Sequence, residues 1–315
     1  MSQKTATKKA VSRKDMTKAQ WTWFQMKQHK VAYFMVAPFM IIFLIFTVIP
    51  VVASLFLSLT TFNMLQTPKF IFLDNYVTLF LDDDLWITAL KNTLIFAAIV
   101  GPASYILSFL VAWFINELPP KIRAVVTLIF YAPSISGNAY LIWQTLFASD
   151  SYGWVNGKLL SWGMIDAPIL WFENEKYVMG LCIIVALWTS LGTSFLSFIA
   201  GLQGIDTAQF EAAAVDGIKN RWQELWYVTL PNMHSQLLFG AVMSITSAFS
   251  FGSIVTTLAG HPSVNYVAYT ISHHLNEYQN TRWEVGYASA ISFVLFLMMI
   301  GSNMAISKLL SKVGR

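Results

Sequence analysis

The sequence predicts an all-α, polytopic membrane protein with six transmembrane helices, and two observations carry this prediction. Apolar residues make up 56% of the 315 residues and charged residues only 11%, whereas soluble domains carry about 25% charged residues. Six apolar stretches contain no Asp, Glu, Lys or Arg: 31–59, 92–116, 124–147, 177–202, 233–259 and 285–307. Each can cross the hydrocarbon layer as a helix, which takes roughly 20 residues.

The positions of Lys and Arg predict the orientation, because positively charged flanks stay on the cytoplasmic side. With the N-terminus inside, fifteen of the twenty Lys and Arg residues fall in cytoplasmic segments, and ten of the sixteen Asp and Glu residues fall in outer loops. Both termini are therefore predicted to be cytoplasmic. This topology explains the net charge of +4, and no zinc or RNA-binding signature suggests nucleic acid as a partner.

The N-terminal region divides into two predicted parts ahead of a transmembrane domain over 31–315. Residues 1–14 are polar and basic, so we expect a disordered tail. Residues 15–30 carry Trp21, Trp23 and Phe24 among lysines, which is typical of an amphipathic helix lying in the membrane interface. The alternative is that these aromatic side chains form the interfacial belt of the first span.

The segment 203–232 joins the fourth and fifth stretches on the predicted cytoplasmic side. Asp206 or Thr207 can cap a first helix, with Gln209 completing a capping box. The alanines that follow predict a narrow helix, and Gly217 is expected to end or bend it. A second helix is expected over 220–229, ending before Pro231. The first helix has the shape to dock into a groove on another protein, although an amphipathic helix on the membrane is the alternative.

This segment carries a resemblance to a known family. The run Glu211-Ala212-Ala213-Ala214-Val215-Asp216-Gly217, continuing to Thr229-Leu230-Pro231, resembles the EAA signature of binding-protein-dependent ABC importer permeases. Further similarity to the carbohydrate-uptake branch lies in Ala37-Pro38, Ile49-Pro50, Leu73-Asp74-Asn75-Tyr76, Asn92-Thr93 and Gly286-Tyr287-Ala288. The first-span and Asp-Asn-Tyr features look most like the larger permease subunit of maltose-type systems.

The resemblance implies a type I ABC importer permease fold in the bacterial inner membrane. It implies that Glu211, Ala212, Ala213, Ala214, Asp216, Gly217 and Pro231 couple the chain to an ATPase. The expected partners are two ATPase subunits, a second, non-identical permease and an external sugar-binding protein. No G-x-x-x-x-G-K-[ST] loop is present, so we expect no enzymatic activity on this chain. ATP and Mg²⁺ are then used by the partner ATPases.

Hydroxyl, amide and aromatic side chains in the apolar stretches are candidates for contact with a sugar. They are Asn138, Tyr140 and Trp143 in the third stretch, Trp188, Thr189, Ser190 and Ser194 in the fourth, and Ser247, Phe249, Ser250 and Phe251 in the fifth. The alternative for each Ser and Thr is a hydrogen bond within its own helix or to a neighbouring one. The expected mechanism is alternating access with an oligosaccharide delivered from outside.

Other functions and sites are less well supported by the sequence. An ion-coupled transporter or channel is the alternative function, but such proteins usually carry intramembrane charges. His273, His274 and Glu277 could suggest a metal site, but their spacing is not diagnostic, and a hydrated outer-loop helix is the expectation. The outer loop over 148–176 is long and rich in Trp, which predicts either a contact surface for an external partner or an interfacial anchor.

Overall fold

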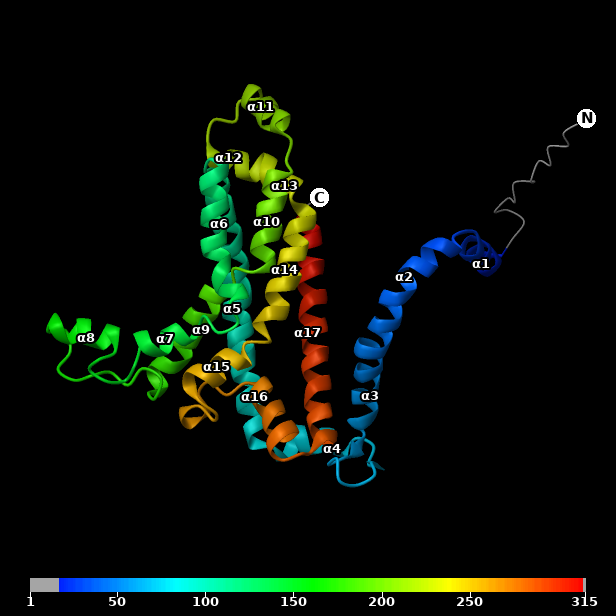
Figure 1. The fold of residues 1–315 in the computed structure, drawn as a ribbon, viewed down its shortest axis with the longest axis vertical. Coiled ribbons are helices and arrows are strands. Elements are labelled where there is room, and N and C mark those ends of the chain that lie inside the picture. The colour runs from blue at the N-terminus through cyan, green and yellow to red at the C-terminus, as the bar shows by residue number, and fades with distance from the viewer. Residues whose placement is uncertain (1–16, 314–315) are drawn as a thin grey trace, which may run out of the picture. The chain divides into compact units, whose positions relative to one another are not determined.

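The computed structural model describes residues 17–313, and the chain divides into two compact units, Met1–Phe56 and Leu57–Arg315. The tail predicted over 1–14 lies outside the described residues. The first unit is helical: α1 (Lys18–Gln28), α2 (Lys30–Phe43), the π-helical turn η2 (Leu44–Val48) and α3 (Ile49–Leu57), the last of which runs one residue into the second unit (Figure 1).

The helix expected near 15–30 begins where its sequence allows a capping box. The Gln20 N–H donates to Thr17 Oγ1 at 3.4 Å, and the Thr17 N–H donates to Gln20 Oε1 at 3.1 Å. After α1, one continuous apolar helical stretch covers Lys30–Leu57, and its most apolar part has no buried residue. This exposure of large apolar side chains suits a lipid environment, and it agrees with the first predicted span.

The second unit begins with a small sheet that the all-α prediction did not contain. Strand β1 (Thr60–Thr61) pairs antiparallel with β2 (Lys69–Phe70), with Thr60 opposite Phe70. The short elements α4 (Asp74–Val77) and η3 (Thr78–Asp82) follow. The Asn75 side chain fixes this region, because its amide donates to the backbone oxygens of Ser58 and Thr60 at 2.7 and 3.0 Å.

Helix α5 (Asp84–Asn116) packs against five other α-helices of the second unit. It begins eight residues before the predicted span because Asp83 caps it, accepting from the N–H groups of Leu85 and Trp86 at 3.1 Å each. Its neighbours are α6 (Pro120–Ile135), α9 (Glu175–Thr189), α10 (Thr193–Gln203), α14 (His234–Ala248) and α16 (Ile271–Asn276). Phe109 of α5 and Phe198 of α10 meet edge to face at 5.6 Å in this core.

Five of the six predicted spans correspond to apolar helical stretches in the described part of the chain. Three are uninterrupted, Lys30–Leu57, Asp84–Asn116 and Val285–Leu310. The fourth, Glu175–Gln203, is α9 followed after a short break by α10, and the fifth is α14 with α15 (Gly252–Ala259), bent by 41°. The continuous helix predicted over 124–147 is wrong. That region forms α6 (Pro120–Ile135) and α7 (Leu141–Leu146), because Pro133 and the Ser136-Gly137-Asn138 run interrupt the helix.

The remaining elements lie in the connections and in the last helix. They are α8 (Trp154–Ser161), α11 (Thr207–Val215), α12 (Arg221–Glu224), η4 (Leu225–Thr229), α13 (Leu230–Asn232), η5 (Val264–Tyr266), η6 (Glu277–Thr281) and α17 (Val285–Val313). In Figure 1, α11 and α12 lie at one end of the second unit, and α4 and α16 lie at the opposite end. The segment 203–232 is therefore separated from the loops that were predicted to be external.

Gly286 lies in the first turn of α17 and touches the β1 hairpin. Its N–H donates to the Phe62 carbonyl at 3.0 Å, and a Cβ there would lie 2.1 Å from the Thr60 carbonyl oxygen. We predict that Gly286→Ala lowers the free energy of unfolding by at least about 2 kcal/mol, because backbone has to move. The melting temperature in detergent should fall by several degrees.

The matched control is Gly301→Ala in the same helix. A Cβ at Gly301 meets nothing within 4 Å, so the melting temperature should stay the same or rise slightly, since alanine favours helix. Equal melting temperatures for the two variants would contradict the close approach of α17 to the hairpin.

A polar network is buried at the end of the unit that holds α16. Asp83 Oδ2 accepts from Tyr287 Oη at 2.8 Å and lies 2.9 Å from His274 Nε2. His273 Nδ1 accepts from the Thr270 N–H at 3.3 Å, and its Nε2 lies 2.9 Å from Thr256 Oγ1. Both histidines are buried, so the prediction that they lie on a hydrated loop helix is wrong.

Burial of His273 predicts a loss of stability in acid. Burial, and to a lesser degree the neighbouring His261, lower the pKa of His273 from 6.5 to about 4. Between these values the unfolded chain binds a proton that the folded chain excludes, so stability is full above pH 6.5 and falls as the pH drops toward 4. The expected loss between pH 7 and pH 5 is about 2 kcal/mol.

Thermal unfolding in detergent at a series of pH values measures this loss. His273→Gln removes the titrating group, so its melting temperature should depend less on pH than that of the parent. The comparison is needed because burial also lowers the pKa of His274. Identical pH profiles for the parent and the variant would show that His273 does not cause the acid sensitivity.

Candidate functional site

Two adjoining cavities lie where three helical stretches are interrupted. The interruptions fall between α6 and α7, between α9 and α10, and between α14 and α15. The cavities have volumes of about 350 and 240 Å³ and share Ser134, Thr189, Ser247 and Phe251 as lining residues. Non-helical backbone at membrane depth is tolerated only where it is buried in protein or lines a water-filled space. The interruptions therefore mark this region as a candidate site.

Most of the predicted substrate-path residues line these cavities. Those that do are Tyr140, Thr189, Ser190, Ser194, Ser247, Ser250 and Phe251. They come from the third, fourth and fifth predicted spans, which the structure brings together. Phe251 lies in the short break between α14 and α15 and faces both cavities.

Four predicted residues do not line the cavities. Trp143 stacks on Phe147 at a ring-centroid distance of 5.6 Å and meets Trp188 edge to face at 5.7 Å, so these tryptophans pack on each other. Phe249 is buried in the core. Asn138 is exposed in the α6–α7 break, where its Oδ1 accepts from Tyr140 Oη at 3.3 Å.

The sequence pattern did not predict the other lining residues. They are Ser104, Tyr131, Pro133, Ser134, Gly137, Gly192, Thr193, Met243, Ser244, Thr246, Ser253 and Ile254. Tyr131 and Ser134 lie within two residues of Pro133, so the proline itself was a signal that this part of α6 is irregular. Ser104 is one of several hydroxyl-bearing residues in α5, and nothing in the sequence distinguishes it from a serine that bonds only to its own backbone.

The lining is rich in hydroxyl groups whose own donor hydrogens are already used. Thr189 Oγ1 lies 3.1 Å from the Val185 and Ala186 carbonyl oxygens, and Ser247 Oγ donates to the Met243 carbonyl at 2.9 Å. Such oxygens keep lone pairs that can accept hydrogen bonds from a ligand.

Aromatic side chains supply the second feature of the lining. Tyr131, Tyr140 and Phe251 are the aromatic lining residues, and none of the described residues in either lining is Asp, Glu, Lys or Arg. The cavities can therefore hold a ligand that donates hydrogen bonds and packs against rings.

The predicted coupling residues lie around α11. Asp206 caps this helix as expected, accepting from the Ala208 N–H at 3.0 Å. Gln209 does not close the predicted capping box, because its Oε1 accepts from the Asn232 side chain. Gly217 has φ +95°, which confirms the predicted bend, since glycine adopts this conformation without steric cost.

One face of this segment is open to solvent in the described chain. Val215 is 88% exposed, and the exposed set also includes Glu211, Ala212, Ala214, Asp216, Gly217 and Pro231. Ala213 is the buried member of the run. The second helix was expected to stop before Pro231, but the chain stays helical through α12, η4 and α13 as far as Asn232. Pro231 is tolerated there because it occupies the first turn of α13.

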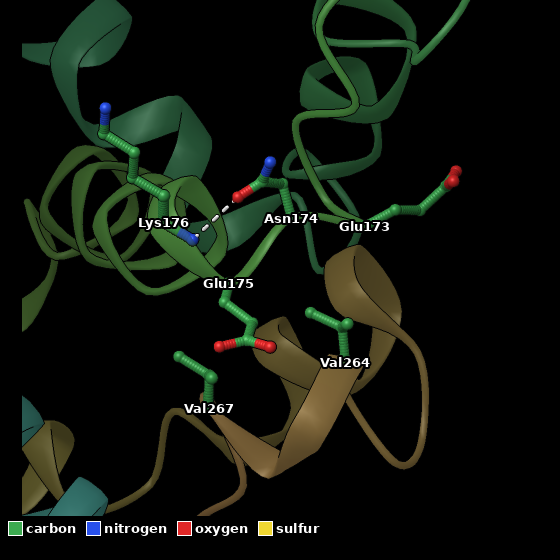
Figure 2. A pocket seen from close by; sticks show the side chains of 6 residues that line it. All are labelled: Glu173, Asn174, Glu175, Lys176, Val264 and Val267. Atoms are coloured by element: carbon green, nitrogen blue, oxygen red, sulfur yellow. Dashed lines mark hydrogen bonds between the residues drawn. The ribbon is translucent and has the colours of Figure 1, made fainter.

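A third hollow lies at the start of α9, away from the hydroxyl-lined cavities. Its volume is about 740 Å³, and its lining residues are Glu173, Asn174, Glu175, Lys176, Val264 and Val267. Figure 2 shows the Glu175 carboxylate between the two valines and the dashed bond from the Lys176 N–H to Asn174 Oδ1, which is 2.9 Å long. This surface is acidic and apolar, and it differs chemically from the cavities among the membrane helices.

Comparison with curated proteins shows similarity along most of the chain. The chain is 33% identical over 279 residues to the probable ABC transporter permease YesP of Bacillus subtilis, covering 87% of this chain and 88% of that protein. It is 31% identical over 236 residues to the inner membrane ABC transporter permease YcjO of Escherichia coli, with 73% and 76% covered. It is 29% identical over 270 residues to the lactose transport system permease LacF of Rhizobium radiobacter, with 84% and 88% covered.

Solved structures share the fold. A chain of a bacterial ABC transporter involved in the import of the acidic polysaccharide alginate superposes with a TM-score of 0.74 at 24% identity, covering 93% of this chain and 99% of that chain. The same type of transporter with an alginate pentasaccharide-bound periplasmic protein gives a TM-score of 0.76, also at 24% identity, with 93% and 98% covered. No protein-family profile matches the sequence. On the similarity to YesP and YcjO, the chain is a multi-pass membrane protein that belongs to the ABC transporter permeases.

Proposed function

We propose that this chain is a permease subunit of an ATP-driven importer for oligosaccharides in the bacterial cytoplasmic membrane. The observation that carries the proposal is that two features occur in the same unit of the chain. Cavities lined by hydroxyl groups and rings lie at the helix breaks, and an exposed alanine-rich helix lies at one end of the unit (Figure 1). Sugars stack on aromatic rings and donate hydrogen bonds through their hydroxyl groups, so the cavity chemistry suits them.

Relatives support an oligosaccharide as the substrate class. LacF is named for lactose transport, and a Bacillus subtilis relative that is 27% identical over 270 residues, AraP, is named for arabinooligosaccharide transport. The lining of the cavities carries no acid or base among the described residues, apart from tyrosine. Binding then depends on hydroxyl contacts and ring stacking rather than on charge.

We further propose the arrangement of the chain in the membrane. Six spans are reached when α6 and α7 together form an interrupted third span, and both termini then lie in the cytoplasm. This orientation places α11 on the cytoplasmic side and the acidic hollow at Glu173 and Glu175 outside. The excess of Lys and Arg in the cytoplasmic segments supports it.

The proposed partners follow from this arrangement. The face of α11 with Glu211, Ala212, Ala214, Asp216 and Gly217 docks onto one of two ATPase subunits, which bind ATP and Mg²⁺. A second, non-identical permease completes the translocation path, and an external binding protein delivers the sugar. ATP binding closes the ATPases and moves α11, which opens the cavities to alternate sides of the membrane in turn.

Uptake by the purified complex in proteoliposomes tests the function. With the binding protein outside and ATP inside, oligosaccharides should accumulate in the vesicles, and mass spectrometry of their contents identifies the sugar. Accumulation should continue when ionophores remove ion gradients. Uptake that needs an ion gradient and ignores ATP would replace the proposal with an ion-coupled carrier.

A further inference from the structure

Helix α5 is a single element that connects the two ends of the second unit. Its 33 residues run without a break from the Asp83 cap to Asn116. Along the way Ser104 lines one of the cavities, and Trp113 near the far end is buried. A long helix packed on several neighbours moves largely as one body, so a force applied near Trp113 also reaches the cavity wall.

The segment 203–232, which contains α11, α12, η4 and α13, has an exposed half and a packed half. Helix α11 exposes Glu211 and Val215. In the following half, Leu225 and Val228 are buried, and Leu225 belongs to the same apolar cluster as Phe109 and Trp113 of α5. The packed half is therefore the part of the segment that is joined to the membrane helices.

The two halves are held together by specific bonds. The Ile218 N–H donates to the Ala213 carbonyl at 3.0 Å across the Gly217 bend. The Asn232 side-chain amide donates to Gln209 Oε1 and to the Val228 carbonyl oxygen. Helix α11 is thus linked through Asn232 to η4, which follows α12 directly in the chain.

Arg221 of α12 joins the packed half to the end of α5. One guanidinium nitrogen, Nη2, lies 2.6 Å from Glu117 Oε2, and Nη1 donates to both carboxylate oxygens of Glu224 at 2.8 Å. The next residue, Trp222, packs its ring against Trp113 at a centroid distance of 5.2 Å. One charged contact, at the C-cap residue Glu117, and one aromatic contact, at Trp113 in the last turn, thus connect neighbouring residues of α12 to the end of α5.

We propose that the Arg221–Glu117 ion pair and the Trp222–Trp113 contact are the positioning contacts through which α11 moves α5. The inference rests on the proposed docking of an ATPase at α11. Arg221 is 59% exposed and Glu117 42% exposed, and ion pairs of that exposure contribute little to folding stability. Their loss should therefore change coupling far more than it changes the melting temperature.

A charge-exchange experiment in the intact complex tests the ion pair. Arg221→Glu and Glu117→Arg are each made alone and then combined, and sugar uptake and ATP hydrolysis are measured in the same proteoliposomes. Each single variant should lower the sugar carried per ATP hydrolysed by about fivefold or more, the size of a modest coupling energy. The double variant should recover most of that loss. Trp222→Ala should also lower the amount of sugar carried per ATP hydrolysed.

Lys121→Glu is the matched control, since it makes the same charge change at exposed Lys121 of α6, next to the same end of α5. This variant should leave the amount of sugar carried per ATP hydrolysed unchanged. The proposal would be overturned if the single variants kept the parental ratio of sugar carried to ATP hydrolysed, or if the double variant recovered none of the loss. If the ATPase still co-purified with every variant, that result would leave the proposed function intact. Failure of the parent chain itself to retain an ATPase would instead remove the proposed function on which the inference rests.

Discussion

Gly217→Pro is expected to abolish sugar uptake while the protein still inserts in the membrane. Gly217 has φ +95°, and proline holds φ near −65°, so the bend after α11 cannot form. The bend sets the direction of α11, whose exposed side carries the proposed docking residues. We expect a reduction of uptake of at least about a hundredfold, because a misaligned α11 loses several contacts with the ATPase at once. Uptake in cells and membrane insertion measured by fractionation check this result.

Gly217→Asn is the matched control for the bend. Asparagine tolerates a positive φ better than other non-glycine residues, and a Cβ at this position meets nothing within 4 Å. Most of the uptake should remain. Glu211→Lys should resemble the proline variant, since it reverses a charge on the exposed side of α11. Normal uptake by the proline and lysine variants would remove the coupling role from this segment.

Ser247→Trp is expected to block uptake without releasing the ATPase. Ser247 lines both cavities, which measure about 350 and 240 Å³, so an indole at this position would occupy space that a sugar needs. Uptake should fall below detection, and ATPase subunits should still co-purify because α11 lies elsewhere. Uptake of labelled sugar and co-purification from the same membranes measure the two effects.

Two controls separate blockage from damage to the fold. Ser247→Ala removes only a hydroxyl and should keep substantial uptake. Leu297→Trp adds the same indole to α17, where the side chain is 51% exposed, and should have little effect on uptake. If the Ser247 and Leu297 tryptophan variants transport equally well, the cavities are not on the sugar path.

The apolar spans could be predicted from the sequence because the need to satisfy every backbone amide in lipid leaves a strong pattern. The beginning of α5 could not, since Asp84 and Lys91 lie inside the helix and interrupt its apolar pattern. The break in the third span was visible only as Pro133 and a run of turn-forming residues. Apolar pattern alone does not decide whether such residues bend a helix or end it.

In the candidate site, too, some residues could be predicted from the sequence and others could not. The hydroxyl cluster from Thr189 to Ser194 could be selected from its composition, whereas Ser104 and Tyr131 lie in helices whose facing sides are set by tertiary packing. The buried position of His273 could not be predicted either, because it depends on Thr256, a residue 17 positions earlier in the chain. Helix rotation and long-range partners are the information that a single sequence lacks.

Purification of the tagged chain in mild detergent from its native membrane tests the central claim most directly. Mass spectrometry of the purified material should identify a second permease and an ATPase, and Glu211→Lys should reduce the recovered ATPase but not the second permease. Recovery of the chain alone, or only as a homo-oligomer, under conditions that keep a known ABC importer assembled would contradict the assignment as a permease subunit that works with a separate ATPase.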